Sequence, residues 1–447
     1  MTTRSPQSPS TRLTAPRRMH LIAYMKTGPT ALHSGGWRHP GSPLNFLDPA
    51  WYEEAAVEFE RARLDGTFFA DLFGIADTYK GLAPFLEMGG QNSYLDPMTV
   101  LPLMARVTSH LGLGATVSTS FHSAFHLARS LQSVDVLSGG RVAWNVVTSA
   151  TETEAANFGA GGLPPHDERY DRADEVLEAV TSLWDSWQPD AFVFDRELGR
   201  FADSSKVSYV DYEGRWTRTR GPLPTPRSAQ GHPVLMQAGS SGRGREFAAR
   251  WAEVVFAREA PVPELLDFRS DMRERTAAAG RDPEAVKILP GVTVVVAETD
   301  AIAREKAEYL ASLEHNEYAS AYQSMLTGAD LSTHATTAEV EAARGNAGIH
   351  GIAEAYARKA AAEGTDFARA VRTTLLDHAV IGSPSTVADV LQERFEAGVG
   401  DGFVLMPTTL PTSHVEFCRL VVPELQRRGL FRTEYAATTL RENLRRP

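Results

Sequence analysis

The chain contains eight short, almost wholly apolar segments separated by helical stretches, and this alternation restricts its fold more than any other feature. Segments of this length and composition are typical of strands that are buried on both faces of a parallel sheet. Eight such strands alternating with helices favour an α/β fold, a closed (β/α)8 TIM barrel. The predicted strands cover residues 19–25, 66–73, 111–119, 141–149, 232–239, 253–257, 286–296 and 402–407.

A doubly wound open sheet would give the same local pattern and is the structural alternative. Amphipathic helices are predicted between the strands, for example at residues 50–64 and 123–140. The first strand lacks the Gly-x-Gly-x-x-Gly fingerprint of dinucleotide-binding sheets. The strand count and the missing fingerprint together favour the barrel.

The chain divides into a tail and one domain. Residues 1–18 are rich in Ser, Thr, Pro and Arg and lack the apolar segment of a signal peptide, so we expect a disordered tail. We expect residues 19–447 to form a single barrel domain. Two stretches within it, at about 188–227 and 327–374, fit no strand–helix unit. They are predicted to be insertions that wall a pocket at the C-terminal face of the barrel.

Composition excludes several classes of function. The 45 Lys and Arg residues against 56 Asp and Glu residues give a net charge of −11, which argues against a nucleic-acid surface. No apolar segment approaches the roughly 20 residues that span a bilayer. The single cysteine, Cys418, excludes an internal disulfide and fits the reducing cytoplasm, where we expect the protein. The histidines show no zinc-binding spacing, so no metal site is predicted.

Polar residues end several of the predicted strands, which is where TIM barrels carry their active sites. Asp71, Thr116 and Asn145 belong to strands two, three and four. Asn145 is expected to contact a ligand, because an amide in mid-strand is costly to bury without a partner; a neighbouring loop could also supply that partner.

The turn after strand five, residues 239–244, contains Ser240 and Ser241 among three glycines and leads into a helix. Free N–H groups and hydroxyls at the positive start of a helix suit an anion. Tight packing of strand and helix could require the same glycines. Because the later strands of barrels often bind phosphate, we favour a phosphate site.

Two further segments offer candidate contacts. In "HDERYDRADEVLEAVTSLWDSW" we predict Asp167 as the N-cap, Tyr170 on the buried face of the helix and His166 outside the cap, free to face a ligand. The loop "HSGGWRHP" after strand one contains His33, Trp37 and Arg38, which are either ordinary loop residues or contacts of a pocket.

Several ordered blocks resemble a known family: "SGGRVAWNVVTS", "ANFG", "HDERYDRADEVLEAVTSLWDSW" and "GHPVLMQAGSSGRGREFAARWAEVVF". They are similar to the flavin monooxygenases grouped with nitrilotriacetate monooxygenase, dibenzothiophene-sulfone monooxygenase and the pristinamycin synthase large component, within the bacterial luciferase-like superfamily. "GGWRHP", "FFADLFG" and "VIGSPSTVADVLQERFEAGVGDGFVLMP" match as well. The resemblance therefore covers nearly everything from Met19 to Leu444.

The resemblance implies a luciferase-like barrel that works as the large component of a two-component system. Such an enzyme takes reduced FMN (FMNH2) from a separate NAD(P)H-dependent FMN reductase and uses O2 to oxygenate a small organic substrate through a flavin C4a-(hydro)peroxide. It also implies a homodimer or homotetramer. The flavin carries the chemistry, so no catalytic base is assigned and the catalytic residues stay unknown.

The resemblance also implies roles for particular residues. Asp71 and Thr116 would contact the flavin or its ribityl chain, and Asn145 the isoalloxazine ring. His166 and Tyr170 would contact the ribityl-phosphate region, while Ser240 and Ser241 would hold the phosphate. His33, Trp37 and Arg38 are candidates for the substrate side.

The second insertion departs from the family pattern. It keeps "GADLS" but not the proline-bearing segment that often follows in relatives, so the substrate is not assigned. Two alternative functions remain at this point: a flavin-binding protein without turnover, and an oxidoreductase of the same superfamily that uses deazaflavin F420.

Overall fold

The computed structural model describes residues 17–30, 32–33, 35–371 and 375–446, and its central feature is a closed barrel of eight parallel strands. The order around the barrel is β10-β9-β4-β3-β2-β1-β13-β11, and β10 pairs with β11 to close it. All eight predicted strands are present and the open-sheet alternative is wrong. The barrel strands are β1 (His20–Met25), β2 (Gly66–Phe69), β3 (Gly112–Ser118), β4 (Val142–Val147), β9 (Val234–Gln237), β10 (Val254–Ala257), β11 (Lys287–Val296) and β13 (Gly402–Met406).

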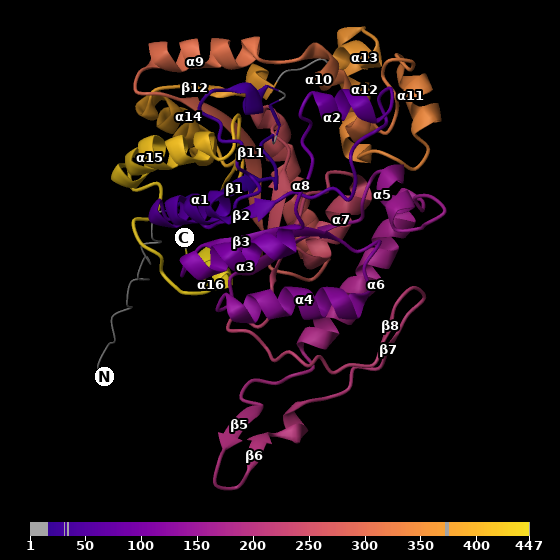
Figure 1. Ribbon diagram of the computed structural model, residues 1–447, viewed down its shortest axis with the longest axis vertical. Helices are drawn as coiled ribbons and strands as arrows, with labels where there is room; N and C mark the ends of the chain where they lie inside the picture. The colour runs from indigo at the N-terminus through magenta and orange to yellow at the C-terminus, as the bar shows by residue number, and fades with distance from the viewer. Residues whose placement is uncertain (1–16, 31, 34, 372–374, 447) are drawn as a thin grey trace, which may run out of the picture.

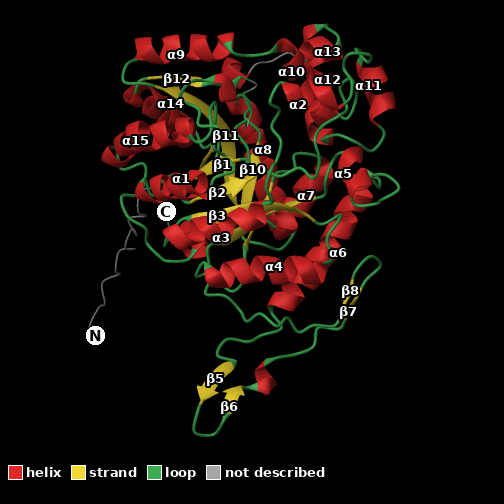
Figure 2. Ribbon diagram, in the orientation of Figure 1, coloured by secondary structure: helices red, strands yellow, loops and turns green. Residues whose placement is uncertain are grey.

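Helices surround the strands (Figure 2). Several begin at the caps that the sequence provides: Asp48 accepts a hydrogen bond from Ala50 N–H at the start of α1, and Ser123 one from His126 N–H at the start of α4. The helices of the barrel and its C-terminal face are α1 (Pro49–Arg61), α2 (Leu82–Glu87), α3 (Pro97–Val107), α4 (Ala124–Leu137), α5 (Glu152–Asn157), α6 (His166–Trp184), α7 (Gly242–Trp251), α8 (Val262–Ala278), α9 (Asp300–Ser312), α14 (Pro384–Glu396) and α15 (Thr412–Arg427). Among the described residues, four 3-10 helices accompany them: η1 (Gly36–Arg38), η2 (Ser204–Lys206), η3 (Pro283–Ala285) and η4 (Leu375–His378).

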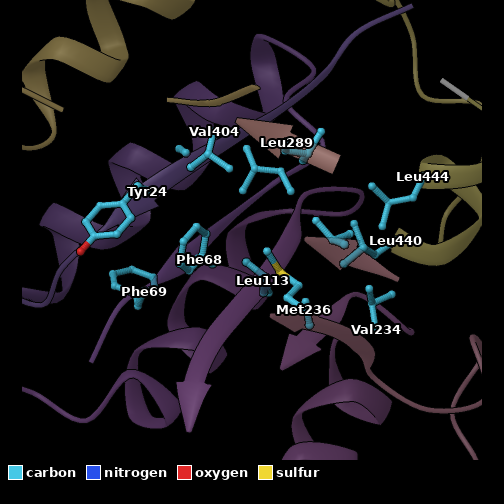
Figure 3. Close-up of a cluster of buried hydrophobic side chains, with 14 of the residues drawn as sticks. Tyr24, Phe68, Phe69, Leu113, Val234, Met236, Leu289, Val404, Leu440 and Leu444 are labelled. Carbon is cyan, nitrogen blue, oxygen red and sulfur yellow. The ribbon is translucent and has the colours of Figure 1, made fainter. Parts of the chain in front are cut away.

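The strands alternate between residues that face the barrel interior and residues that face the helices. Tyr24 of β1 meets Phe68 of β2, with ring centroids 5.4 Å apart, and Phe68 meets Phe256 across the barrel at 6.0 Å. Trp144 of β4 instead packs outward on Trp184 of α6 at 6.2 Å. Figure 3 shows Tyr24 and Phe68 among the apolar side chains gathered between the strands.

A short helix, α16 (Leu440–Arg445), lies where the barrel strands begin. Its Leu440 lies against Gly112, the first residue of β3, and its N–H donates to Gly140 O at 3.1 Å. Leu440 and Leu444 are both buried and join the apolar cluster of the barrel (Figure 3). The N-terminal end of the barrel is thus packed with side chains, which leaves the C-terminal end for a ligand.

The first insertion lies away from the C-terminal face, in contrast to the prediction. It forms two hairpins, one of β5 (Phe192–Asp195) and β6 (Arg200–Ala202), the other of β7 (Tyr212–Glu213) and β8 (Arg218–Thr219). The insertion follows helix α6 rather than a barrel strand, so it starts from the opposite end of the barrel. The β5–β6 hairpin projects away from the barrel (Figure 1), and the carboxylate of Glu175 on α6 accepts hydrogen bonds from the turn between β7 and β8.

The second insertion covers the C-terminal face, as predicted, but it is longer and more regular than expected. It begins at residue 316 and consists of α10 (Asn316–Thr327), α11 (Thr337–Arg344), α12 (His350–Glu363) and α13 (Phe367–Ala370), ahead of strand β12 (Val380–Gly382), which pairs with β11. These helices lie beside α2 and α5 (Figure 1). Gly348 N–H donates to Ala150 O, just beyond β4, at 2.7 Å. Residues 372–374 of the predicted insertion lie outside the described residues.

The predicted tail, residues 1–18, lies outside the described residues except for its last two. Of these, Arg17 donates to Gly400 O at 3.0 Å and lies over the ring of Phe395. Along the described part of the chain, none of the helices has the length and apolar character that crossing a membrane requires.

Candidate active site at the mouth of the barrel

The serine turn after β9 joins the starts of two helices. The Ser241 hydroxyl caps α7 by accepting a hydrogen bond from Gly244 N–H at 3.1 Å, and it lies 3.3 Å from Nε2 of His166. His166 is the first residue of α6, whose N-cap is Pro165, so the predicted N-cap at Asp167 is wrong. Asp167 lies in the first turn instead, where its carboxylate is 2.7 Å from Nδ1 of His166.

A third helix, α12 of the second insertion, begins at the same turn. The ring of His350, its first residue, stacks on His166 with centroids 4.4 Å apart. A Cβ atom on Gly351 would lie 2.2 Å from the Ser240 hydroxyl and 3.1 Å from Ser241 N, so α12 begins in close contact with the turn. Burial, followed by the nearby Arg344, His166 and Arg169, lowers the pKa of His350 to about 4. Three positive helix starts at one turn create a favourable place for an anion.

A cavity of about 260 Å³ adjoins the turn and carries further positive charge. Ser240, Gly242 and Gly351 line it. Its charged lining consists of four arginines, Arg245, Arg258, Arg275 and Arg358, and two glutamates, Glu264 and Glu354. Arg245 donates to Ser240 O at 2.9 Å and pairs with Asp271. Arg258 and Arg358 form no ion pair with any described residue. Their guanidinium groups therefore have donors left for a phosphate held at the helix starts.

Tyr170 lies buried beside the turn, as its helical spacing predicts. Its hydroxyl accepts from Nε2 of Gln237, the last residue of β9, at 3.5 Å. A Cβ atom on Gly239 or Gly244 would come within 2.8 or 2.9 Å of the same hydroxyl, so both glycines make room for it. Oε1 of Gln237 has no hydrogen-bond partner among the described residues. A polar ligand such as a flavin fits these groups, because it would supply the partner that this buried acceptor lacks.

Polar side chains continue around the mouth on the neighbouring strands. Asn145 of β4 donates through Nδ2 to Oγ1 of Thr116 on β3 at 2.8 Å, so a neighbouring strand, not a loop, supplies its partner. Because Trp144 points outward, Asn145 faces the interior of the barrel. Asp71, beyond β2, accepts from Leu72 N–H at 2.9 Å, and burial raises the pKa of its carboxyl. The predicted candidates thus lie on β3 and β4 and just beyond β2, three adjacent strands of which β4 pairs with β9.

Sequence reasoning missed two groups that hold this site together. The buried guanidinium of Arg169 donates to Ser149 O beyond β4 and to Asn346 O in the second insertion, the latter at 3.1 Å. Glu154 accepts from the N–H groups of Ala150 and Thr151, each at 3.1 Å. The Thr-x-x-Glu spacing of its capping box is visible in the sequence, whereas the partners of Arg169 depend on tertiary packing.

The three candidates for the substrate side hold their loop in place. Nε2 of His33 lies 3.5 Å from Glu314, and burial lowers the pKa of this histidine to about 4. Trp37 donates to Met88 O at 2.9 Å and Arg38 to Leu313 O at 2.8 Å. These contacts tie the loop after β1 to the residue following α2 and to the end of α9. A substrate role for His33, Trp37 and Arg38 stays a prediction.

Within the ranges that the structure describes, no group of three or more His, Cys, Asp or Glu side chains is arranged to hold a metal ion. The polar groups at the mouth of the barrel include hydroxyls, amides, helix starts and arginines. Such groups bind and orient an anionic organic molecule.

Comparisons with known proteins point to one family. Residues 30–401 match the family described as luciferase-like monooxygenase. Dibenzothiophene-sulfone monooxygenase of Rhodococcus erythropolis strain XP is 41% identical over 449 residues, which cover 97% of each chain. The crystal structure of a long-chain alkane monooxygenase matches with a TM-score of 0.86 at 34% identity over 96% of each chain. That of a riboflavin lyase with modified FMN and its substrate riboflavin matches with a TM-score of 0.83 at 34% identity, again over 96% of each chain.

Proposed function

This chain belongs to the luciferase-like monooxygenase family, and from that premise we propose that it is the oxygenase component of a two-component flavin system. A separate NAD(P)H-dependent reductase supplies reduced FMN. The oxygenase then catalyses the reaction of a small organic substrate with FMNH2 and O2 to give the oxygenated substrate, FMN and water. One atom of O2 enters the substrate, and the other leaves as water with the two electrons and two protons of the reduced flavin.

The observation that carries the proposal is the convergence of three helix starts on the turn at Ser240 and Ser241. FMN ends in a phosphate, and a site with free N–H groups, two hydroxyls and nearby arginines suits that dianion. The structure of the riboflavin lyase, which contains modified FMN, supports the same choice of cofactor.

The bound reduced flavin would supply the electrons that activate O2. The chain's own residues have three tasks. The serine turn, with His166 and Tyr170, holds the phosphate end. Asn145, Thr116 and Asp71 orient the remainder along the mouth. The second insertion covers the site and keeps bulk water out, which favours transfer of oxygen to the substrate over release of hydrogen peroxide.

The oligomeric state and the location of the protein belong to the same proposal. We expect a homodimer or homotetramer in the cytoplasm, on the grounds of the family resemblance and the single cysteine. The alternatives, a flavin-binding protein without turnover and an F420-dependent oxidoreductase, have less support. The relatives that cover nearly the whole chain include monooxygenases of a sulfone and of alkanes.

The test is anaerobic titration of the full chain with reduced and with oxidised FMN, followed by admission of oxygen. We expect tighter binding of the reduced form, and release of hydrogen peroxide that is slower than from free reduced FMN. A true substrate then lowers the peroxide formed per O2 consumed. Equal binding of both forms with immediate peroxide release would favour the protein without turnover. Binding of F420 but not FMN would favour the deazaflavin enzyme.

A further inference from the structure

Lys26 directly follows β1 and lies at the mouth of the barrel. It is two residues beyond Tyr24, whose ring packs inside the barrel on Phe68. Because side chains alternate along a strand, Lys26 lies on the same, inner side as Tyr24. Only 4% of its surface is exposed. A lysine this deeply buried is rare unless its charge has a partner.

The ammonium of Lys26 has no such partner within the described residues. Its one hydrogen bond goes to Oγ of Ser93, at 3.3 Å. No described carboxylate lies within 4 Å of it, although Asp71 and Glu154 are near enough to raise its pKa. Burial outweighs them and lowers the pKa to about 8, so the group is still mainly protonated at pH 7. A buried cation with one hydrogen bond has capacity for an anionic ligand.

A second polar group in the segment that contacts the end of β1 also lacks a partner. The segment around residues 92–95 runs along the end of β1, where Tyr94 N–H donates to Thr27 O at 3.2 Å. Asn92 in this segment is 2% exposed, and neither its Nδ2 nor its Oδ1 has a hydrogen-bond partner among the described residues. Buried amides without partners are uncommon in folded proteins. The cation and the amide together indicate a ligand-binding surface at the end of β1.

This surface lies opposite the serine turn. Going around the barrel from β9, the order is β4, β3, β2 and then β1, which is half of the eight strands. A ligand held by its phosphate beyond β9 and extending across the mouth past Asn145 and Thr116 reaches the end of β1 with its other end. In FMN, the end remote from the phosphate is the ring system.

We propose that the Lys26 ammonium binds the negative charge that the flavin ring acquires on reduction, and so makes the affinity for reduced FMN higher than that for oxidised FMN. The inference rests on the proposed function, since it assumes that FMN is the ligand. The phosphate is present in both redox forms, so the serine turn cannot distinguish them. Reduction makes the ring anionic near neutral pH, and a fixed cation near it favours that form.

The experiment compares Lys26→Met with the wild type in anaerobic titrations with oxidised and reduced FMN and in potentiometry of the bound flavin. We expect Lys26→Met to lower the affinity for reduced FMN by about 10- to 100-fold, which is the effect of losing one hydrogen bond to a charged group. The affinity for oxidised FMN should fall much less. The midpoint potential of the bound flavin falls accordingly. Lys26→Arg, which keeps the charge, retains most of the preference.

Two controls separate the possible failures. Ser240→Ala should lower the affinity for oxidised and for reduced FMN by the same factor. Lys206→Met, in the first insertion, should change neither affinity. Circular dichroism checks that each variant is folded. If the wild type binds FMN in neither form, the proposed function fails. If the wild type prefers reduced FMN and Lys26→Met keeps the same ratio of affinities, only the inference about Lys26 is overturned.

Discussion

The two insertions begin at opposite ends of the barrel, and this difference decides what each one touches. The second follows β11 and α9 and lies over the mouth, where Gly351 contacts the serine turn and His350 stacks on His166. The first follows α6 and carries the hairpin β5–β6 away from the barrel. Length and irregularity do not separate the two in the sequence. The element that precedes an insertion does, because strands end at the mouth of a barrel and helices end at the opposite face.

Helix α6 holds both insertions, each through a different part of its length. Arg169, in its first turn, reaches the second insertion through Asn346 O. Glu175, less than two turns further along, holds the β7–β8 turn of the first. If the first insertion is structural and the second functional, substitutions at these two residues of one helix should have separable consequences for flavin binding.

The largest effect is expected for Arg169→Met. The buried guanidinium holds the carbonyl groups of Ser149, beyond β4, and of Asn346, in the second insertion. Its removal should lower the free energy of unfolding by about 3 kcal/mol, the loss of hydrogen bonds from a charged donor. We also expect faster proteolysis of residues 316–371 and at least a roughly 10-fold weaker affinity for FMN. Urea unfolding, limited proteolysis and flavin titration measure the three effects. An unchanged affinity would show that the second insertion does not support the flavin site.

A smaller, pH-dependent effect is expected at the contact between α12 and the serine turn. The pKa of His350 is about 4 while α12 is docked, against an ordinary value of 6.5. Undocking therefore takes up a proton at any pH between these values, so docking is strongest above pH 6.5 and weakens as the pH falls towards 4. Since the ring is only partly buried, solvent reduces the effect, and we expect FMN affinity to fall by a factor of about 3 to 10 between pH 7.5 and 5.

The control for this pH dependence is His350→Phe, which keeps a ring against His166 but cannot be protonated. Protonation of the FMN phosphate affects the variant and the wild type alike. The difference between their pH profiles therefore reports on the ionisable ring at position 350. Identical profiles would show that this residue does not control the docking of α12.

The sequence was sufficient for the barrel but only partly for the site. The eight strands are apolar enough to be found without the structure. Once a barrel is predicted, polar residues near the ends of its strands, such as Asn145 and Ser241, become candidates for the site. The contacts of Arg169 and His350 depend on where the second insertion packs, which no local pattern reports. Lys26 could have been found in the sequence, because it directly follows the apolar segment "LIAYM" of the first predicted strand. The capping box of Thr336 and Glu339 likewise indicates the start of α11 within the second insertion.

The smallest effect on flavin binding is expected for Glu175→Ala. The carboxylate accepts hydrogen bonds from the N–H groups of Arg215, Trp216 and Thr217 at 2.8, 2.7 and 2.5 Å, and each is lost in the variant. These N–H groups lie at a partly exposed turn where water replaces the carboxylate. We therefore expect a loss of only about 1 kcal/mol in stability and faster proteolytic cleavage near residues 214–217. The affinity for FMN should stay within about twofold of the wild type, since no contact of the serine turn involves this hairpin among the described residues. Flavin titration and proteolysis on the same preparation measure the two effects. A clear loss of affinity for FMN would mean that the first insertion also supports the mouth of the barrel. The contrast between the two insertions would then be wrong.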